Sequence, residues 1–521
     1  MTTVEGSNKY RVIGTRPMRH DAVDKVTGAA KYGADFSAPG MLHGKILRSP
    51  HAHAKILSID TSKAEAVPGV LAVATAADFP IISARALDYE NFQGNPRLIA
   101  ENIFANEKVL YKGHAIAAVA ATSQHVAEEA AALIDVKYEV LPTVLGWRDA
   151  LKDDAPLLHD QMTTRFRVER FGPGDDTGEI SNIAGHLQHK LGDIDKGFKE
   201  ADVIFEKEYE TQTVHQGYIE PHVASAVWGS DGRVTVWTST QGPFSVRTAT
   251  AAILGIPDSS VKVVPMEIGG GFGAKGVTYL APVAAVLAKK SGKPVKVVMT
   301  RKEVFEGSGP ASATFMRVKL GAKKDGKLTA GQVYMVYEAG AFPGAPVGGG
   351  AVTTFGSYNC ENILVDGYDV VCNKQKAQAY RAPGQPQAGF AVECAIDELA
   401  DELKVDPMEL RLKNAVSEGD RMPNGVAHAR FGCVELEEAM KNHPHYLAPL
   451  GGPNRGRGVA VAFRAQGGQV SSATINVNSD GTLNLITGSV DIGGTRTATC
   501  LLYTSDAADE RSSVDLGGRR I

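Results

Sequence analysis

Residues 268–275 read Ile268-Gly269-Gly270-Gly271-Phe272-Gly273-Ala274-Lys275, with glycine at four of five consecutive positions. The preceding segment, 261–267, alternates in polarity as a strand does, and the apolar run at 279–287 is typical of a helix. A glycine loop between a strand and a helix can present backbone N–H groups to an oxyanion or to the oxygens of a cofactor. The stretch therefore predicts an α/β fold with a ligand-binding loop at 269–273.

Bulk composition excludes several classes of protein. The 521 residues are enough for roughly three to four domains. The net charge is −4 with no basic block, which argues against nucleic acid as a partner, and no apolar run approaches the ~20 residues of a membrane span. The first twenty residues lack the pattern of an export signal. We therefore expect a cytoplasmic protein without a membrane span.

The five cysteines stand apart in the sequence, at Cys360, Cys372, Cys394, Cys433 and Cys500. No CxxC pair is present, so the chain offers neither the ligand spacing of an iron–sulfur cluster nor that of a zinc knuckle. Isolated thiols also fit a reducing cytosol.

Patterns of polarity divide the chain into six segments. They are an arm at 1–18, an α/β domain at 19–145, a connector at 146–190, a second domain at 191–440, the start of a third domain at 441–499 and a tail at 500–521. The connector is rich in Asp, Gly and Thr. Candidate strands at 459–463 and 473–477 open the third domain, and Asp406 is predicted to cap a helix that starts at Pro407.

The tail at 500–521 carries no continuation of the strand pattern and resembles a translated transposase-type sequencing adapter. On that interpretation the native protein continues past Thr499, and much of the third domain is missing. A natural polar tail is the alternative.

Two motifs suggest other kinds of site, a dinucleotide site and a metal site, and the sequence gives evidence on both. Gly271–Gly276 fits GxGxxG, but a dinucleotide site also needs an acidic residue about 20 positions on, and position 296 is Lys. His51 and His53 would lie on one side of a strand, as metal ligands or as a structural pair, and no third ligand is nearby. We favour neither a dinucleotide site nor a metal site.

Three further segments are candidates for binding or chemistry. Glu220 and His222 are close enough for acid–base work or for a buried hydrogen-bonding turn. Gln241 ends a predicted strand, which is a normal ligand position in α/β folds, although an ordinary turn glutamine is equally compatible. Arg381 lies in a tight loop, 379–387, where its guanidinium can bind an anion or pair with a carboxylate at a structural corner.

Taken in their order along the chain, the motifs resemble the molybdopterin-binding large subunits of the xanthine dehydrogenase/aldehyde oxidase family of molybdenum hydroxylases. The resemblance runs from about residue 14 to 499. The resemblance implies an α/β (mixed α+β) fold, with a hammerhead domain at 19–145 and a first molybdopterin-binding domain at 191–440. Residues 441–499 would begin a second, incomplete molybdopterin-binding domain. The resemblance also favours the structural interpretation of His51 and His53.

The resemblance also implies a set of cofactor-binding residues. These are Gln241, Gly270, Gly271, Phe272, Gly273, Arg381, Ala382, Gln385, Gln387, Gly493 and Gly494. No side chain would ligate molybdenum directly, because the pterin, in a mono- or dinucleotide form, would hold the metal. A small-molecule substrate would be hydroxylated with oxygen from water. Electrons would pass to 2Fe–2S clusters and FAD on an iron–sulfur small subunit and an FAD-binding medium subunit, in a dimer of heterotrimers.

The sequence departs from the family pattern at three places. Gly276 stands where purine-oxidising members carry a carboxylate, and residues 307–312 lack the arginine of those enzymes. Aldehydes or neutral N-heteroaromatic compounds are therefore better expected substrates than purines. The family's general-base glutamate is not present before Thr499, so this fragment is expected to be inactive. The alternatives are a non-enzymatic paralogue of the same fold and a nucleotide-dependent dehydrogenase.

Overall fold

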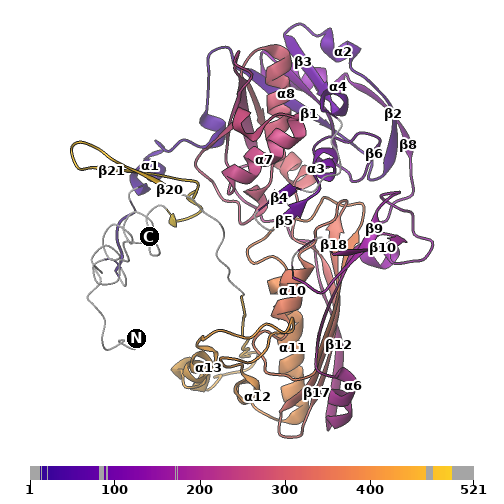
Figure 1. The fold of residues 1–521 in the computed structure, drawn as a ribbon, viewed down its shortest axis with the longest axis vertical. Helices are drawn as coiled ribbons and strands as arrows, with labels where there is room; N and C mark the ends of the chain where they lie inside the picture. The colour runs from indigo at the N-terminus through magenta and orange to yellow at the C-terminus, as the bar shows by residue number, and fades with distance from the viewer. Residues whose placement is uncertain are drawn as a thin grey trace.

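The computed structural model describes Val12 and residues 15–19, 21–80, 87–89, 92–170, 172, 174–464 and 473–495. The predicted tail at 500–521 and most of the predicted arm at 1–18 lie outside the described residues. Two large mixed sheets with helices against them form most of the described chain (Figure 1). This confirms the predicted mixed α/β class. Within the described residues, no helix has the length and apolar character to cross a bilayer.

The first large sheet crosses the predicted boundary at residue 145. Its strands, in spatial order, are β15 (Val261–Pro265), β14 (Val234–Thr238), β13 (Val223–Trp228), β16 (Val295–Val298), β1 (Leu42–Arg48), β7 (Ala115–Ala121) and β3 (Val70–Thr75). The helices α4 (Gln124–Ala132), α7 (Pro243–Leu254) and α8 (Ala281–Ser291) pack against it. Every residue of β7 is buried, because strands lie on both sides of it and its side chains are small and apolar.

The second large sheet uses strands from the segment predicted to be a connector. Its spatial order is β10 (Asp175–Ile180), β9 (Thr163–Arg167), β11 (Ile183–Leu191), β19 (Ile363–Val371), β18 (Leu328–Gly340), β17 (Thr314–Ala322) and β12 (Val203–Thr211). The connector prediction for 146–190 is therefore wrong. Polarity could not reveal β10, because all six of its residues are exposed and no alternation is left.

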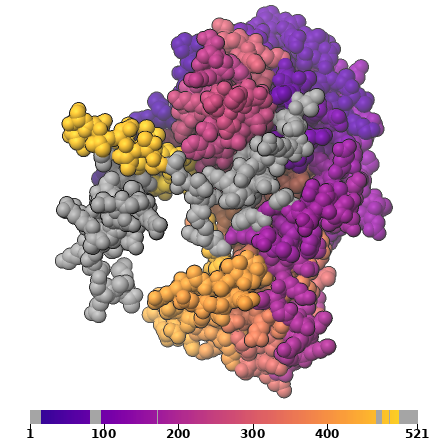
Figure 2. Space-filling view, in the orientation of Figure 1, coloured from indigo at the N-terminus to yellow at the C-terminus, as the bar shows by residue number. Residues whose placement is uncertain are grey.

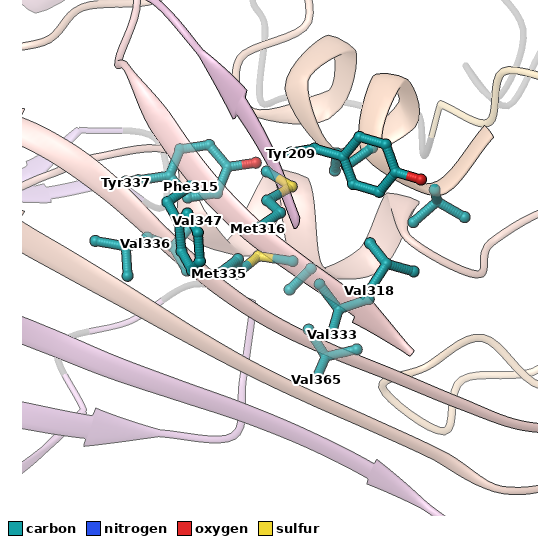
Figure 3. Packing of buried hydrophobic residues seen from close by; sticks show 14 of the residues in the cluster. Tyr209, Phe315, Met316, Val318, Val333, Met335, Val336, Tyr337, Val347 and Val365 are labelled. Atoms are coloured by element: carbon teal, nitrogen blue, oxygen red, sulfur yellow. The ribbon is translucent and has the colours of Figure 1, made fainter. Parts of the chain in front are cut away.

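Helices α10 (Val347–Thr353) and α11 (Gln385–Leu403) lie along one side of this sheet (Figure 1). Figure 3 shows the core of this layer, where aromatic, Met and Val side chains from the strands meet Val347 of α10: Tyr209, Phe315, Met316, Val318, Val333, Met335, Val336, Tyr337 and Val365. Tyr337 of this core donates its hydroxyl hydrogen to the carbonyl of Gly384, directly before α11, and the first residue of α11 belongs to the candidate site described below.

The remaining elements are short. A three-stranded sheet contains β6 (Lys108–Val109), β2 (Ala54–Asp60) and β8 (Asp135–Val140), and β4 (Leu87–Tyr89) pairs with β5 (Phe92–Gly94). The other helices are α1 (Ala22–Thr27), α2 (Ser62–Glu65), α3 (Pro96–Ile103), α5 (Trp147–Ala150), α6 (Ile194–Glu200), α9 (Arg301–Gly307), α12 (Pro407–Asn414), α13 (Cys433–Lys441) and α14 (Pro444–Leu447). Asp406 caps α12 as predicted, because its carboxylate accepts the amide hydrogens of Met408 and Glu409.

The predicted third domain contributes a separate hairpin. The strand predicted at 473–477 is confirmed as β20 (Ala473–Val477), which pairs with β21 (Leu483–Thr487). The strand predicted at 459–463 is wrong: this segment pairs with no strand of the described chain, and the Val461 amide donates to the Glu393 carboxylate instead. In Figure 2 the yellow hairpin lies against the part built on the first sheet, away from the orange α12 and α13 that precede it in sequence.

Candidate cofactor site

The glycine loop follows β15 and turns sharply before α8. Gly270 and Gly273 have φ angles of 93° and 111°, which favour glycine, and Phe272 takes φ 53° despite its side chain. A short 3-10 turn, η4 (Ala274–Gly276), continues the loop. The helix begins at 281, two residues later than the apolar run suggested.

Two of the glycines are required because their neighbours approach the backbone closely. A Cβ on Gly271 would lie 2.6 Å from Oε1 of Gln241, and a Cβ on Gly273 would lie 2.7 Å from the carbonyl oxygen of Ala379. The structure thus brings three sequence-distant segments together: the glycine loop, the end of β14 and the loop before α11. The sequence pointed to each of these segments separately.

Gln241 is held by the glycine loop in one orientation. Its Oε1 accepts hydrogen bonds from the amides of Gly273, at 2.8 Å, and Lys275, at 3.3 Å. Its backbone amide donates to the carbonyl of Lys275 at 2.9 Å. The side-chain Nε2 makes no hydrogen bond to any described residue, so its two N–H groups remain to donate to a ligand.

The loop itself also leaves donors unused. The backbone N–H groups of Gly270, Gly271 and Phe272 bond to no other group in the described part of the chain. The carbonyl of Phe272, by contrast, accepts the amide hydrogen of Arg381 at 2.8 Å. Successive free amides in a glycine-rich turn form a concave, electropositive surface that favours anionic or oxo groups.

Arg381 and Ala382 lie directly beside the glycine loop. Ala382 has φ 64°, a second non-glycine residue in the left-handed region at this site. The Arg381 guanidinium is exposed and forms no ion pair within the described ranges, so the structural-corner interpretation of this arginine finds no carboxylate there. Non-glycine residues at positive φ on two adjoining loops are typical of a site shaped for a ligand.

The two glutamines of this loop differ in their surroundings. Gln385 is the first residue of α11 and is buried, and its backbone amide donates to the carbonyl of Ala382 at 3.1 Å. Gln387 donates from Nε2 to the carbonyl of Ser312 at 3.4 Å. The Gln387 side chain therefore holds the 307–312 loop in place.

Beneath the glycine loop lies a buried ion pair that sequence reasoning missed. Glu220 Oε2 lies 2.7 Å from Lys275 Nζ and accepts the Gly269 amide hydrogen at 2.7 Å, while its Oε1 accepts from the Gly33 amide at 3.2 Å. The Lys275 side chain is fully buried. Burial lowers the pKa of Lys275, and the charge of Glu220 opposes that shift. A lone lysine inside an apolar, glycine-rich stretch was the available signal for a buried partner.

His222 does not act with Glu220 as an acid–base pair in this structure. The imidazole is buried between the rings of Tyr218 and Tyr279, with ring centroids at 5.3 and 4.9 Å. Burial and the nearby Lys275 charge lower its pKa to about 3, so it stays neutral at physiological pH. The geometry agrees with the buried-turn interpretation.

The turn predicted to bind cofactor at Gly493 and Gly494 is closed by its own aspartate. Both amides donate to Asp491 Oδ1, at 2.8 and 2.7 Å. These two N–H groups are therefore already bonded. The segment before the turn packs on α7, since a Cβ on Gly488 would lie 2.1 Å from the Phe244 ring.

The histidine motif has a structural role. His53 is buried, and its Nδ1 lies 2.6 Å from the carbonyl oxygen of Pro142. His51 packs edge-on against Tyr138, with ring centroids 4.9 Å apart. Among the residues that the structure describes, no group of three His, Cys, Asp or Glu side chains could hold a metal ion.

The dinucleotide alternative fails on topology. A Rossmann unit needs the strand before the glycine loop and the strand after its helix to be parallel neighbours. Here β14 and β13 separate β15 from β16 in the first sheet. The residue at the required acidic position, Lys296, donates instead to the carbonyl oxygen of Ala34 at 2.7 Å.

The structure is that of an α/β protein in which the glycine loop, Gln241 and the loop of Arg381 adjoin one another and leave hydrogen-bond donors unused. Two families match the sequence: "Molybdopterin cofactor-binding domain" over residues 176–415, and "Aldehyde oxidase and xanthine dehydrogenase, a/b hammerhead domain" over residues 27–142. The chain belongs to the molybdopterin-binding xanthine dehydrogenase/aldehyde oxidase family.

Individual relatives show how much of such proteins the chain spans. It is 34% identical to the "Nicotinate dehydrogenase large molybdopterin subunit" of Eubacterium barkeri, over 83% of this chain and 96% of that protein. The solved aldehyde oxidoreductase from Desulfovibrio gigas superposes with a TM-score of 0.77 at 29% identity, over 90% of this chain and 51% of that one. The solved quinoline 2-oxidoreductase from Pseudomonas putida superposes with a TM-score of 0.72 at 28% identity, over 82% of this chain and 53% of that one. The chain thus spans about half the length of these two solved relatives.

Proposed function

We propose that this chain is the cofactor-binding catalytic subunit of a molybdenum hydroxylase. The observation that carries the proposal is the set of unused donors: Nε2 of Gln241, the amides of 270–272 and the guanidinium of Arg381. All of them donate and none accepts, which suits a cofactor with oxo and phosphate oxygens. When bound, the molybdenum–molybdopterin cofactor would supply the oxidation of a C–H bond with water as the oxygen source.

The residues of the chain would position and orient that group. Gln241 Nε2 would donate to an oxygen at the metal, while its Oε1 keeps the amide fixed on the loop. The 270–272 amides, with Phe272, would form one wall, and Arg381 and Ala382 the adjacent one. Gln385 and Gln387 would support that wall from the start of α11. Gly493 and Gly494, in the predicted third domain, would approach the cofactor from another side. Because their amides are already bonded, they would contribute carbonyl oxygens or the shape of their backbone.

The substrate class follows from what the pocket lacks. A Cβ on Gly276 would meet no atom within 4 Å, so the place of a family carboxylate is open and carries no charge. Residues 307–312 contain no guanidinium. A purine would therefore find neither a carboxylate at position 276 nor a guanidinium at 307–312. We propose an aldehyde or a neutral N-heteroaromatic substrate, classes to which the names of the two solved relatives also point.

The electrons would leave through partner subunits. The chain has no CxxC spacing, and its four described cysteines are free, consistent with a cytoplasmic protein. We therefore propose an iron–sulfur subunit with 2Fe–2S clusters and an FAD-binding subunit as partners, assembled as a dimer of heterotrimers.

A substrate panel tests the proposed function. The purified, cofactor-loaded enzyme complex is assayed with an aromatic aldehyde, quinoline and xanthine in water enriched in heavy oxygen. We expect label in the product from the aldehyde or the N-heteroaromatic compound and a much weaker reaction with xanthine. Xanthine as the best substrate would contradict the proposed substrate class, and unlabelled product would contradict the proposed reaction.

A further inference from the structure

A chain of ion pairs joins the N-terminal segment to the 491–494 turn. Arg19 binds Asp21 through two hydrogen bonds, at 3.0 and 2.9 Å, and its Nη2 lies 3.4 Å from Oδ2 of Asp491. The Asp491 side chain is 1% exposed. Because its other oxygen accepts the amides of Gly493 and Gly494, this carboxylate defines the shape of the turn and connects it to Arg19.

The same segment reaches the strand that leads into the glycine loop. Lys25, on α1, lies 2.5 Å from Asp21 and 3.3 Å from the carboxylate of Glu267. The amide of Glu267 donates to the carbonyl of Lys31 at 3.1 Å. Glu267 precedes the glycine loop by two positions, so one network touches both the loop entrance and the 491–494 turn.

A third contact anchors this segment beneath the loop. The Gly33 amide donates to Glu220, the carboxylate that also binds Gly269 and Lys275. Gly33 lies so close to β13 that a Cβ there would come within 2.2 Å of Val223. We call residues 19 and 21–35 the N-terminal strap.

The hairpin before the turn supports it only weakly. A two-stranded hairpin is marginally stable alone, and β20 is exposed along its whole length. Gly493 and Gly494 have φ angles of 132° and 113°, where the backbone is most free. Figure 1 shows α1 beside this hairpin, far in sequence from it.

We propose that Arg19, Asp21 and Lys25 are positioning residues, which hold the 491–494 turn in register with the glycine loop and so help retain the cofactor. None of the three contacts the proposed ligand site itself. The cofactor part of this proposal rests on the proposed function. The attachment of the turn does not.

Arg19→Ala in the full enzyme complex tests the attachment. Loss of the charge-assisted contact should make amide hydrogens of 488–495 exchange about tenfold faster, with the exchange of β13 and β14 unchanged. Arg16→Ala is the matched control, since Arg16 is exposed and its side chain forms no hydrogen bond or ion pair with a described residue. Equal exchange in the Arg19→Ala variant and the wild type would overturn the proposal.

Two further variants separate positioning from general destabilisation. Arg19→Lys should restore slow exchange, and Arg19→Ala with Asp491→Asn should exchange no faster than Arg19→Ala alone, because both changes break one link. Molybdenum retained after prolonged dialysis should fall several-fold in Arg19→Ala but not in Arg16→Ala. Faster exchange with unchanged molybdenum would overturn the cofactor part. A wild-type complex without molybdenum would refute the proposed function, and the exchange data would still decide the attachment.

Discussion

Gln241 has a single side-chain amide group, and the structure divides its two ends between two tasks. The oxygen binds the loop through Gly273 and Lys275, and the nitrogen is left for a ligand. A side chain whose acceptor is already bonded cannot rotate its amide without breaking those bonds. The donor is thus held in place before any ligand arrives, which is the condition for efficient electrostatic stabilisation.

Gln241→Ala should lower kcat about hundredfold, because one fixed donor at the reacting group is lost. The loss of two neutral hydrogen bonds should lower the free energy of unfolding by only about 1–3 kcal/mol. Steady-state kinetics of the complex and thermal unfolding measure the two effects. Gln124→Ala, at the start of α4, is the control. Full activity with normal cofactor loading would contradict the assigned role.

The glycines of the loop should differ in their tolerance of alanine. Gly273→Ala should be the most damaging, by roughly 2–4 kcal/mol, because its φ is positive and the opposing atom is the Ala379 backbone carbonyl. Gly271→Ala should cost less, since the new Cβ would displace the end of a side chain, with the loss of its two hydrogen bonds, and would not meet backbone. Gly276→Ala meets open space and should be nearly neutral. Chemical denaturation ranks the three, and a different order would contradict the contacts described for the loop.

Acid should destabilise the protein through His222. Its folded pKa of about 3 lies below the unfolded value of 6.5, so the unfolded state binds the extra proton between these values. The contribution of the neutral imidazole is present above pH 6.5 and is lost as the pH falls toward 3. His222→Phe should therefore remove roughly 2 kcal/mol of the stability difference between about pH 6.5 and about pH 5. Equal pH slopes in the variant and the wild type would show that the imidazole is not buried as described.

For single residues, the sequence predicted which ones belong to the candidate site better than it predicted which residues they contact. Gln241, the glycine loop and Arg381 could be selected because their residue types and spacing suit ligand binding, and the family resemblance supplied their roles. The Glu220–Lys275 pair could not be found, since 55 positions separate the two residues and only the folded chain brings them together. The bond between Asp491 and the Gly493 amide was likewise invisible to the glycine pattern.

Elements were predictable where burial leaves a pattern. β3 and β7 are runs of mostly apolar residues because both lie in the first sheet, and such short apolar runs are typical of buried strands. Residues 175–180 carry no such pattern, although they form β10, because an exposed edge strand needs only backbone pairing. Residues 459–463 show the converse: they resemble a strand in sequence, yet Val461 bonds to the Glu393 side chain in place of a neighbouring strand.

Helix α13 contains a buried carboxylate with the opposite pH dependence to His222. Glu437 is 2% exposed, and burial, together with the charge of Glu393, raises its pKa to about 7, while Cys433 opposes the shift. The folded pKa lies above the unfolded value of 4.5, so stability is lost as the pH rises from 4.5 through 7. Glu437→Gln should remove up to roughly 3 kcal/mol of this loss. Urea unfolding at about pH 5 and about pH 8 measures it, and a variant that keeps the wild-type difference would contradict the assignment.

The candidate site lies where the two large sheets meet. The first sheet supplies the glycine loop and Gln241, and the second carries α11, whose N-terminal loop contains Arg381. Ligand pockets are common at such junctions between structural units. The N-terminal strap contacts both the 491–494 turn and Glu267 before the glycine loop, so the two ends of the described chain meet. A sequence divided into consecutive domains could not predict this, since every wall combines distant segments.

The molybdenum content of the purified enzyme complex, measured by elemental analysis per polypeptide of this chain, tests the central claim most directly. We expect about one molybdenum atom per chain in the wild type, with a large loss in Gly273→Ala and none in Gly276→Ala. A complex whose iron–sulfur and FAD subunits are fully loaded, but whose wild-type chain carries no molybdenum, would contradict the account.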